Sequence, residues 1–331
     1  TAIDPEKVLY KGRLQPGKML LVDTEQQRLI DDEEIKHLVA TERPYGEWYA
    51  RHVVDLDSLM PPQHVFGSTD LIPYDQQEQE RVFGYTQEDM DKIILPMARD
   101  GKQPIDSMGM DIALPILSDR PQLLYDYFQE NFAQVTNPPI DGVRENIVMS
   151  SIVMAGNVAN IMDPDDKDTA ALYLKRPILT NEETAVIKSL MNEKLRSSVI
   201  SMLYPVSGGT EAMETAIESL CIDALKAIRS GANILVLSDR GTNSRMAAIP
   251  ALLATAALHH FLIRQTVRSD VGLILESGEP REIHHFCTLL GYGITAINPY
   301  VALESIKELI AKRKLGSIDY ETARENYLQA S

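Results

Sequence analysis

The chain has 331 residues, which is long enough for one large domain or for more than one. Its 44% hydrophobic content and mixed charge argue against wholesale disorder, and no apolar run approaches the length of a membrane span. The formal net charge of -16, without a basic cluster, argues against nucleic-acid binding, and two distant cysteines are typical of a reducing cytosol. We therefore expect a cytoplasmic protein with neither nucleic acid nor membrane as a partner.

Residues 1–59 contain few predicted elements. The stretch "GKMLLVDTEQQRLI", residues 17–30, predicts two short strands joined by a polar turn. A helix follows at "DDEEIKHLVATE", residues 31–42, with Asp31 or Asp32 as its N-cap and Pro44 beyond its end. Two strands and one helix are too little for a separate core, so we expect residues 1–59 to be the end of a larger domain.

Residues 60–181 are rich in turns and proline and are expected to be helical and loop-rich. Thr86 can cap an amphipathic helix at "QEDMDKIILPMARDG", residues 87–101, which is kinked at Pro96 and stopped near Gly101. A second amphipathic helix is predicted at "RPQLLYDYFQENFAQV", residues 120–135. It ends at "TNPPID", where the prolines favour an extended backbone.

Residues 182–331 alternate buried strands with helices. The predicted strands are 197–206, 232–239, 271–278 and 294–300. The predicted helices are 209–231, 246–265, 280–293 and 301–314, with Asn298 capping the last of them. Four such βα units require parallel pairing, and they suit either half of a (β/α)8 barrel or a doubly wound sheet. The predicted fold class is α/β, with about four βα units.

Two histidines and a cysteine in "REIHHFCTLLGYG" raise the question of a metal site. His284 and Cys287 share one helix face at i, i+3, whereas His284 and His285 point about 100° apart. A structural zinc needs four ligands, and no second Cys or His pair has suitable spacing, although His259 and His260 could approach through the fold. We interpret these histidines as buried or interface residues and predict no metal ligand.

Two loops after predicted strands have the position of a binding site. "PVSGGTEAM" places Gly208, Gly209 and Thr210 before a helix, a geometry that can hold phosphate, but Glu211 would repel an anion. We favour Thr210 as a helix cap. "LSDRG" places Asp239 and Arg240 at the carboxyl end of a strand, where a structural clamp is the favoured interpretation. The residues alone predict neither a catalytic nor a cofactor-binding site.

Several long phrases together resemble the large subunit of glutamate synthase. They include "KGRLQPGKMLLVDTE", "FGYTQEDMDKIILPMARDGKQPIDSMGMD", "LSDRPQLLYDYFQENFAQVTNPPIDGVRE" and "EIHHFCTLLGYGITAINPY", and the resemblance runs from about residue 11 to residue 314. "SSVISMLYPVSGG" departs from the family's usual strand. The resemblance implies that residues 1–59 are the tail of a type II glutamine amidotransferase domain and residues 60–331 the central domain, divided at 181/182 into a helical part and βα repeats.

The resemblance also implies an activity for the whole enzyme, an oxidoreductase that makes L-glutamate from L-glutamine and 2-oxoglutarate in ammonia assimilation. The family's central domain is regarded as a degenerate relative of its FMN-binding barrel, and it links that barrel to the amidotransferase domain. FMN and an iron–sulfur cluster are cofactors of other domains, and a small reductase subunit or ferredoxin is a partner of the parent enzyme. Residue 1 is Thr1, where the family's amidotransferase domain begins with a catalytic cysteine, so we expect this chain alone to be inactive.

In the family, ammonia travels between the two active sites past the central domain. The stretches "SMGMD" and "TNPPID" resemble its wall segments, which implies a role for Met108, Met110, Thr136, Asn137 and Pro138. Methionine side chains and fixed backbone groups suit a path for neutral ammonia better than ionised groups do. The alternatives are an autonomous module that binds phosphate or flavin near Gly208 and Gly209, and a metalloprotein.

Overall fold

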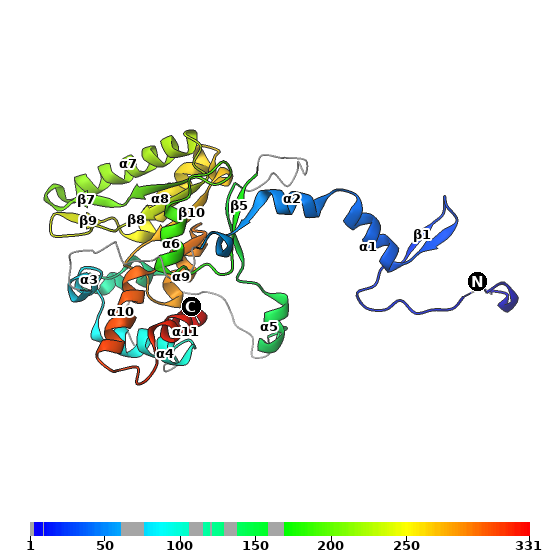
Figure 1. The fold of residues 1–331 in the computed structure, drawn as a ribbon, viewed down its shortest axis with the longest axis horizontal. Helices are drawn as coiled ribbons and strands as arrows, with labels where there is room; N and C mark the ends of the chain where they lie inside the picture. Colours follow the sequence, from blue (N-terminus) through cyan, green and yellow to red (C-terminus); the bar gives the residue numbers. More distant parts are fainter. Residues whose placement is uncertain are drawn as a thin grey trace. The chain divides into compact units, whose positions relative to one another are not determined.

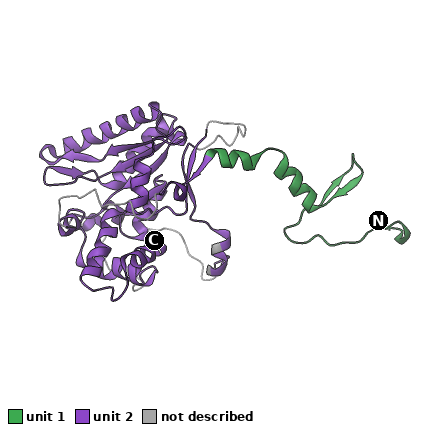
Figure 2. Cartoon of the chain, in the orientation of Figure 1, with its two compact units in different colours: residues 1–52 green, residues 53–331 purple. Residues whose placement is uncertain are grey.

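The computed structural model describes residues 3–8, 10–60, 76–105, 115–119, 121–128, 138–157 and 169–331. The chain divides into two compact units, Thr1–His52 (unit 1) and Val53–Ser331 (unit 2), which are coloured separately in Figure 2. Figure 1 labels the helices and strands. None of the helices in the described ranges is long and apolar enough to cross a bilayer.

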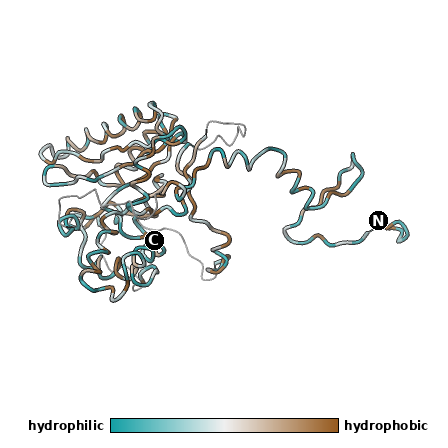
Figure 3. The backbone as a smooth tube through the Cα atoms, in the orientation of Figure 1, coloured by the Kyte–Doolittle hydropathy of each residue, from teal (hydrophilic) through white to brown (hydrophobic). Residues whose placement is uncertain are grey.

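Unit 1 contains the predicted hairpin and helix. Strands β1 (Leu21–Asp23) and β2 (Arg28–Ile30) pair antiparallel, and α1 (Asp32–Thr41) begins after Asp31, whose carboxylate accepts from the backbone N–H of Glu34 at 2.9 Å. A further helix, α2 (Tyr45–His52), follows Pro44. These predictions are confirmed. Apolar residues line the hairpin (Figure 3), yet Leu20, Val22 and Leu29 are more than half exposed.

The centre of unit 2 is a parallel sheet in the order β11-β10-β8-β6 among the described strands. Its strands are β6 (Ser197–Ser201), β8 (Ile234–Ser238), β10 (Gly272–Glu276) and β11 (Ala296–Asn298). All four lie within predicted strands, and the parallel pairing is confirmed. The spatial order follows the chain without a reversal, but the sheet is open in the described part of the chain, so the structure does not confirm a barrel.

Helices cover one face of this sheet (Figure 1). They are α7 (Gly209–Arg229), α8 (Ala251–Arg264), α9 (Ile283–Gly291) and α10 (Tyr300–Ala311). Their apolar residues pack with Leu235 and Leu237 of β8 and with Leu273 and Leu275 of β10. Strands β8 and β10 are buried along their whole length, as a parallel sheet covered on both faces requires.

A small sheet, in the order β3-β5-β4, covers the opposite face of the parallel sheet. It contains β3 (Val53–Asp55), β4 (Val153–Gly156) and β5 (Ala171–Leu174), and α6 (Asn181–Lys188) packs beside it. Its apolar residues pack with Ile234 and Val236 of β8 and with Ile274 of β10. The sequence did not predict these three strands.

Unit 2 contains further helices and a second hairpin. They are the short helix α3 (Gln76–Val82), a π-helix (Asp89–Ile94) continued by α4 (Leu95–Asp100), α5 (Gly142–Val148), the hairpin strands β7 (Leu203–Pro205) and β9 (Met246–Ala248), and α11 (Tyr320–Ala330). The predicted cap at Thr86 is confirmed, because its hydroxyl accepts from the N–H of Asp89 at 3.1 Å. Gly101 ends α4 in the left-handed conformation, also as predicted.

Two of the predicted helices are wrong in part. Met246–Ala248 forms β9, paired with β7, so α8 begins five residues later than predicted, at Ala251. Of the helix predicted over 120–135, the described residues form only a 3-10 helix, Leu124–Tyr127, and Phe128 is extended. Tyr125 is buried beneath α9, where it stacks on His285, and this tertiary contact outweighs the local helical pattern.

Candidate functional site at the carboxyl edge of the parallel sheet

The carboxyl ends of the parallel strands bring polar residues to one edge of the sheet. Ser238 at the end of β8, Glu276 at the end of β10 and Asn298 at the end of β11 stand in register across the three strands. All three side chains are buried. Because α/β proteins bind their ligands at this edge, its chemistry decides what kind of site unit 2 can offer.

Glu276 is the centre of a satisfied ionic network. Its carboxylate accepts from Ser238 Oγ at 2.6 Å, Arg240 Nε at 2.6 Å and Lys188 Nζ at 3.2 Å. Burial raises the pKa of Glu276, but Arg240, Ser238 and Lys188 outweigh it, so the pKa lies below its usual value. Arg240 also lies over the ring of Tyr300, 4.1 Å from its centre. The network holds an ionised carboxylate, with its charge balanced by residues of the same chain.

Asp239 lies next to this network, but its pKa is raised, whereas that of Glu276 is lowered. Its carboxyl group is buried and accepts from Ser277 Oγ at 2.5 Å and from the N–H of Gly278 at 3.2 Å. Burial raises the pKa of Asp239 to about 7, although Ser277, Tyr300 and Gly278 act to lower it, and nearby Glu279 raises it further. The expected clamp between Asp239 and Arg240 does not form, because Arg240 pairs with Glu276.

Arg281 fastens the loop after β10 to the segment before the π-helix. Its guanidinium donates to the carbonyls of Phe83 at 3.1 Å and Gly84 at 3.0 Å and pairs with Asp89 at 3.0 Å. It also lies over the ring of Tyr85, whose hydroxyl donates to the carbonyl of Gly278. Sequence reasoning did not single out Arg281 or Glu276, although Glu276 directly follows the apolar run "GLIL" as a charged residue and Arg281 stands in the loop after it.

A cleft of about 730 Å³ opens beside this loop. Its wall includes Glu279, Arg281, Glu282 and His285. His285 Nε2 lies 2.9 Å from Glu282 Oε1, and Glu279 Oε2 accepts from the N–H of Ala251 at 3.1 Å. Burial raises the pKa of Glu279, which favours the neutral acid. Glu282 and His285 are paired with each other, whereas Glu279 Oε1 is buried without a hydrogen-bond partner among the described residues.

The histidines and Cys287 do not converge. His259 Nδ1 accepts from Arg268 Nε at 3.0 Å, His284 Nε2 lies 3.0 Å from the carbonyl oxygen of Tyr125, and Cys287 is exposed. Among the described residues, no three His, Cys, Asp or Glu side chains are arranged to hold a metal ion. His285 is buried, as the sequence interpretation expected, whereas His260 and His284 are exposed.

Two predicted caps are wrong. Thr210 lies inside α7, whose N-cap is Gly208 without a side-chain cap, and Gly209 has φ +56°. Asn298 does not cap α10, because its amide donates to the carbonyl of Leu179 and to Asn181 Oδ1, both at 3.0 Å. The amide of Asn298 therefore ties the end of β11 to the segment that precedes α6.

Four of the five predicted tunnel residues, Met108, Met110, Thr136 and Asn137, lie outside the described residues. The fifth, Pro138, is exposed and stands three residues before Asp141, which caps α5 by accepting from the N–H of Val143 at 3.1 Å. That these five residues line an ammonia tunnel stays a prediction.

Comparison with known families identifies two matching regions. A profile described as the glutamate synthase central domain matches residues 78–331, and one described as class-II glutamine amidotransferases matches residues 1–48. The first match covers most of unit 2, and the second lies within unit 1.

Curated relatives match nearly the whole chain. "Glutamate synthase [NADPH] large chain" of Bacillus subtilis (strain 168) is 41% identical over 98% of this chain and 21% of its own length. "Glutamate synthase [NADH]" of Schizosaccharomyces pombe is 39% identical over 99% of this chain and 16% of its own length. "Ferredoxin-dependent glutamate synthase 2" of Synechocystis is 38% identical over 98% of this chain and 21% of its own length. The chain thus spans between 16% and 21% of the length of these relatives.

Proposed function

Because the chain belongs to the family of glutamate synthase central domains, we propose that it is the central, non-catalytic region of a glutamate synthase large chain. In this proposal residues 1–59 are the tail of the amidotransferase domain and residues 60–331 the central domain. The parent enzyme makes L-glutamate from L-glutamine and 2-oxoglutarate in the cytoplasm. The matches at residues 1–48 and 78–331 support this division.

The observation that carries the scaffold role is the state of the buried charges at the carboxyl edge of the sheet. Glu276 is neutralised by Arg240 and Lys188, and Arg281 is fully engaged by carbonyls and Asp89. Catalytic groups must be able to meet a substrate, whereas these ionic groups are occupied within the chain. Here the polar groups join segments that lie far apart in the sequence, which is what a rigid spacer between two reaction centres needs.

The relatives' names add independent support. They include enzymes named for NADPH, NADH and ferredoxin, and all three match this chain at similar identity. A region that did the electron-transfer chemistry would be expected to differ with the donor, whereas a shared spacer would not. In the proposal, FMN and an iron–sulfur cluster are bound by other parts of the parent chain, and a small reductase subunit or ferredoxin contacts those parts as well.

The strand order supports kinship with a barrel. Strands β6, β8, β10 and β11 follow one another in chain order with their connecting helices on one face, which is the winding of a (β/α)8 barrel and differs from a doubly wound sheet. In the proposal, unit 2 keeps about four βα units, and the small sheet and α6 cover the face that a barrel would turn inward.

The finer part of the proposal is that the central domain forms part of the ammonia tunnel. Met108, Met110, Thr136, Asn137 and Pro138 are proposed to line it, because thioether and backbone groups pass neutral ammonia without holding it as an ion. The amidotransferase and FMN-barrel domains of the same polypeptide are the partners on either side.

The test is a pair of substitutions in the full-length enzyme, Met110→Trp and Thr136→Trp. We expect glutaminase activity to be retained and glutamate formation per glutamine hydrolysed to fall, because a bulky ring closes the path without touching either reaction centre. Ile222→Trp, at a half-exposed position on α7, is the control and should leave the ratio unchanged. If the ratio is unchanged in all three variants, these residues do not form the tunnel wall.

A further inference from the structure

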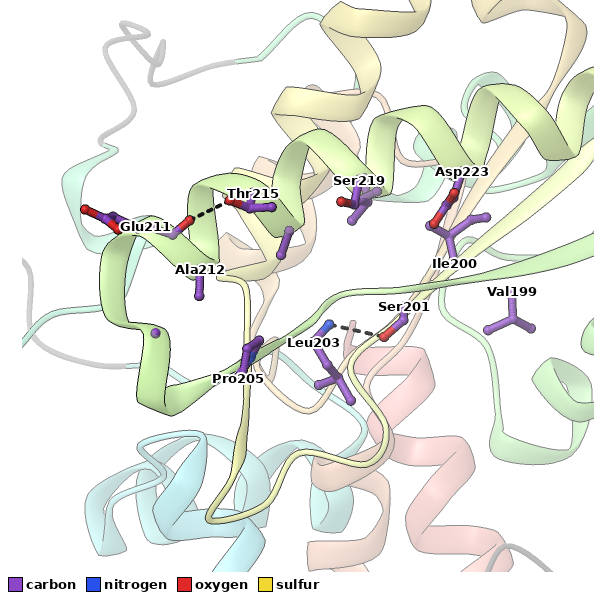
Figure 4. A pocket seen from close by; sticks show the side chains of 13 residues that line it. Val199, Ile200, Ser201, Leu203, Pro205, Glu211, Ala212, Thr215, Ser219 and Asp223 are labelled. Carbon is purple, nitrogen blue, oxygen red and sulfur yellow. Dashed lines mark hydrogen bonds between the residues drawn. The ribbon is translucent and has the colours of Figure 1, made fainter.

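A surface groove runs between the edge of the parallel sheet and α7 (Figure 4). It has a volume of about 720 Å³. One wall is made by the outermost strand and the start of β7, and the other by about the first four turns of α7. Its lining residues are Val199, Ile200, Ser201, Leu203, Pro205, Gly208, Glu211, Ala212, Thr215, Ala216, Ser219, Leu220 and Asp223.

The strand wall is an open sheet edge. Within the described chain, β6 is the last strand of the sheet and pairs with β8 on one side only. The carbonyl of Arg196 accepts from the N–H of Ile234, and the N–H of Met202 donates to the carbonyl of Ser238. Because bonding direction alternates along a strand, the backbone groups of the even-numbered residues in this segment face β8. The backbone groups of Val199 and Ser201 therefore point outward, toward the groove.

Only the beginning of this edge is closed within the described chain. The N–H of Ser197 donates to the carbonyl of Leu190 at 3.0 Å, and the Ser197 hydroxyl donates to the carbonyl of Lys188. Val199 is 46% exposed, whereas the inner strands β8 and β10 of the same sheet are wholly buried. An exposed edge of this kind is a template for an added strand.

The helix wall gives the groove its charge. Glu211 and Asp223 are exposed and stand at opposite ends of it (Figure 4). Twelve residues of α-helix separate them by about 18 Å, which is the length of roughly five residues of extended chain. Lys226 pairs with Asp223 at 2.9 Å, but the pair is exposed and its strength is correspondingly small. Between the two carboxylates the wall is small and neutral, with Ala212, Thr215 and Ser219.

We propose that this groove binds an extended segment that adds to β6 as a strand and carries Lys or Arg residues on one face, about four or six positions apart. The occupant is a segment of the same polypeptide outside these 331 residues, and this rests on the proposed function. Relatives are about five times as long as the chain, so most of the polypeptide is tethered close to the groove at high effective concentration. A second copy fits poorly, because pairing β6 with β6 would bring two acidic helices together.

The experiment places the photo-crosslinking residue benzoylphenylalanine at Val199 in the full-length protein. Ile263, on α8 and 48% exposed, is the matched control. We expect irradiation to join Val199 to a peptide of the same polypeptide outside residues 1–331 that contains Lys or Arg, as read by mass spectrometry, with a much lower yield at Ile263. The double variant Glu211→Lys, Asp223→Lys should lower the yield several-fold, and Glu214→Lys, Glu218→Lys, on α7 outside the groove, should not.

Each other outcome overturns the proposal. A crosslink between two polypeptides of equal mass would make the groove a self-association surface, a crosslink to another protein would make it a site for a separate partner, and no crosslink above the Ile263 control would leave the edge unpaired. The intact mass of the labelled polypeptide separately reports whether the chain is part of a large subunit, so failure of the proposed function is distinguished from failure of this inference.

Discussion

Asp239 illustrates how one buried side chain sets a pH dependence. Its pKa is raised to about 7, mainly by burial, whereas an unfolded chain would ionise near the ordinary value of 3.8. Between these two values the unfolded chain has released the proton and the folded chain still holds it. Ionisation then favours the unfolded state, and the contribution of Asp239 to stability is lost as the pH rises through this window, by up to about 1.4 kcal/mol per pH unit.

We therefore predict that Asp239→Asn, which carries no ionisable proton, is destabilising at pH 5 and less so at pH 7.5. The measurement is the free energy of unfolding in urea at both pH values for wild type and variant. Asp270→Asn, at an exposed position, is the control. An equal difference between wild type and Asp239→Asn at the two pH values would show that this carboxyl group does not titrate in the window.

Individual side chains were the least predictable part of the molecule. Thr86 and Asp31 cap helices as expected, because their partners lie three residues away in the sequence. Asn298 and Arg281 instead bond to residues more than a hundred positions away, and the pairing of Arg240 with Glu276 replaces the expected one with Asp239. Local sequence contains no information about such distant partners, so the capping rules failed where a tertiary partner was available.

At the scale of elements, the contact between the two sheets depends on glycine. A Cβ on Gly272 would lie 2.6 Å from the backbone nitrogen of Gly156 and 3.0 Å from the Cα of Ala155. Gly156 itself has φ +142°, which side chains rarely adopt, and a Cβ there would lie 2.3 Å from the carbonyl oxygen of Ala170. Strands β4 and β10 thus meet backbone to backbone, with no room for a methyl group.

Gly272→Ala is predicted to destabilise unit 2 by about 1–3 kcal/mol, the usual penalty for overpacking a rigid interior, because the atoms that it meets belong to backbone. Gly291→Ala is the matched control, since a Cβ at this position at the end of α9 meets nothing within 4 Å. Thermal unfolding of both variants checks the prediction. Equal melting temperatures of the two variants would show that the contact between β4 and β10 accommodates a methyl group.

The predictability of elements followed their length and burial. The apolar runs of β8 and β10 and the long amphipathic pattern of α7 were identified correctly, because burial on both faces or on one stripe determines each residue type. The small sheet was missed because β3, β4 and β5 have only three or four residues each. So few residues do not show the alternation of apolar and polar side chains that identifies a strand. β9 was assigned to a helix because "MAA" fits either state until its partner β7 is known.

At the scale of the whole molecule, the two units differ in how much they bury. In the described part of unit 1, Ile30 and Asp32 are the buried residues, whereas β8 and β10 of unit 2 are fully enclosed. A two-stranded hairpin without a covered face is marginally stable in water. In the proposed function this hairpin is the end of an amidotransferase domain, in agreement with the match of residues 1–48 of this chain to the class-II glutamine amidotransferases.

Hydrogen exchange tests this difference. In the 331-residue chain, the amides of residues 21–30 should exchange within seconds to minutes, and those of 234–238 and 272–276 should stay protected for far longer. In the full-length enzyme the hairpin should become protected as well, because in the proposed function the rest of an amidotransferase domain covers it. Strong protection of 21–30 in the short chain would contradict the interpretation of unit 1 as an incomplete domain.

The contacts of Arg281 also determine when unit 2 can fold. Its bonds to Phe83 and Gly84 span 198 and 197 residues, and that of Tyr85 to Gly278 spans 193. During synthesis the segment from α3 to α4 leaves the ribosome long before the loop that fastens it exists. Contacts so distant in sequence slow folding, because a long loop must close before they form. The nascent chain is therefore expected to hold this segment undocked until residues 278–281 have emerged, a period in which its apolar side chains are open to chaperones.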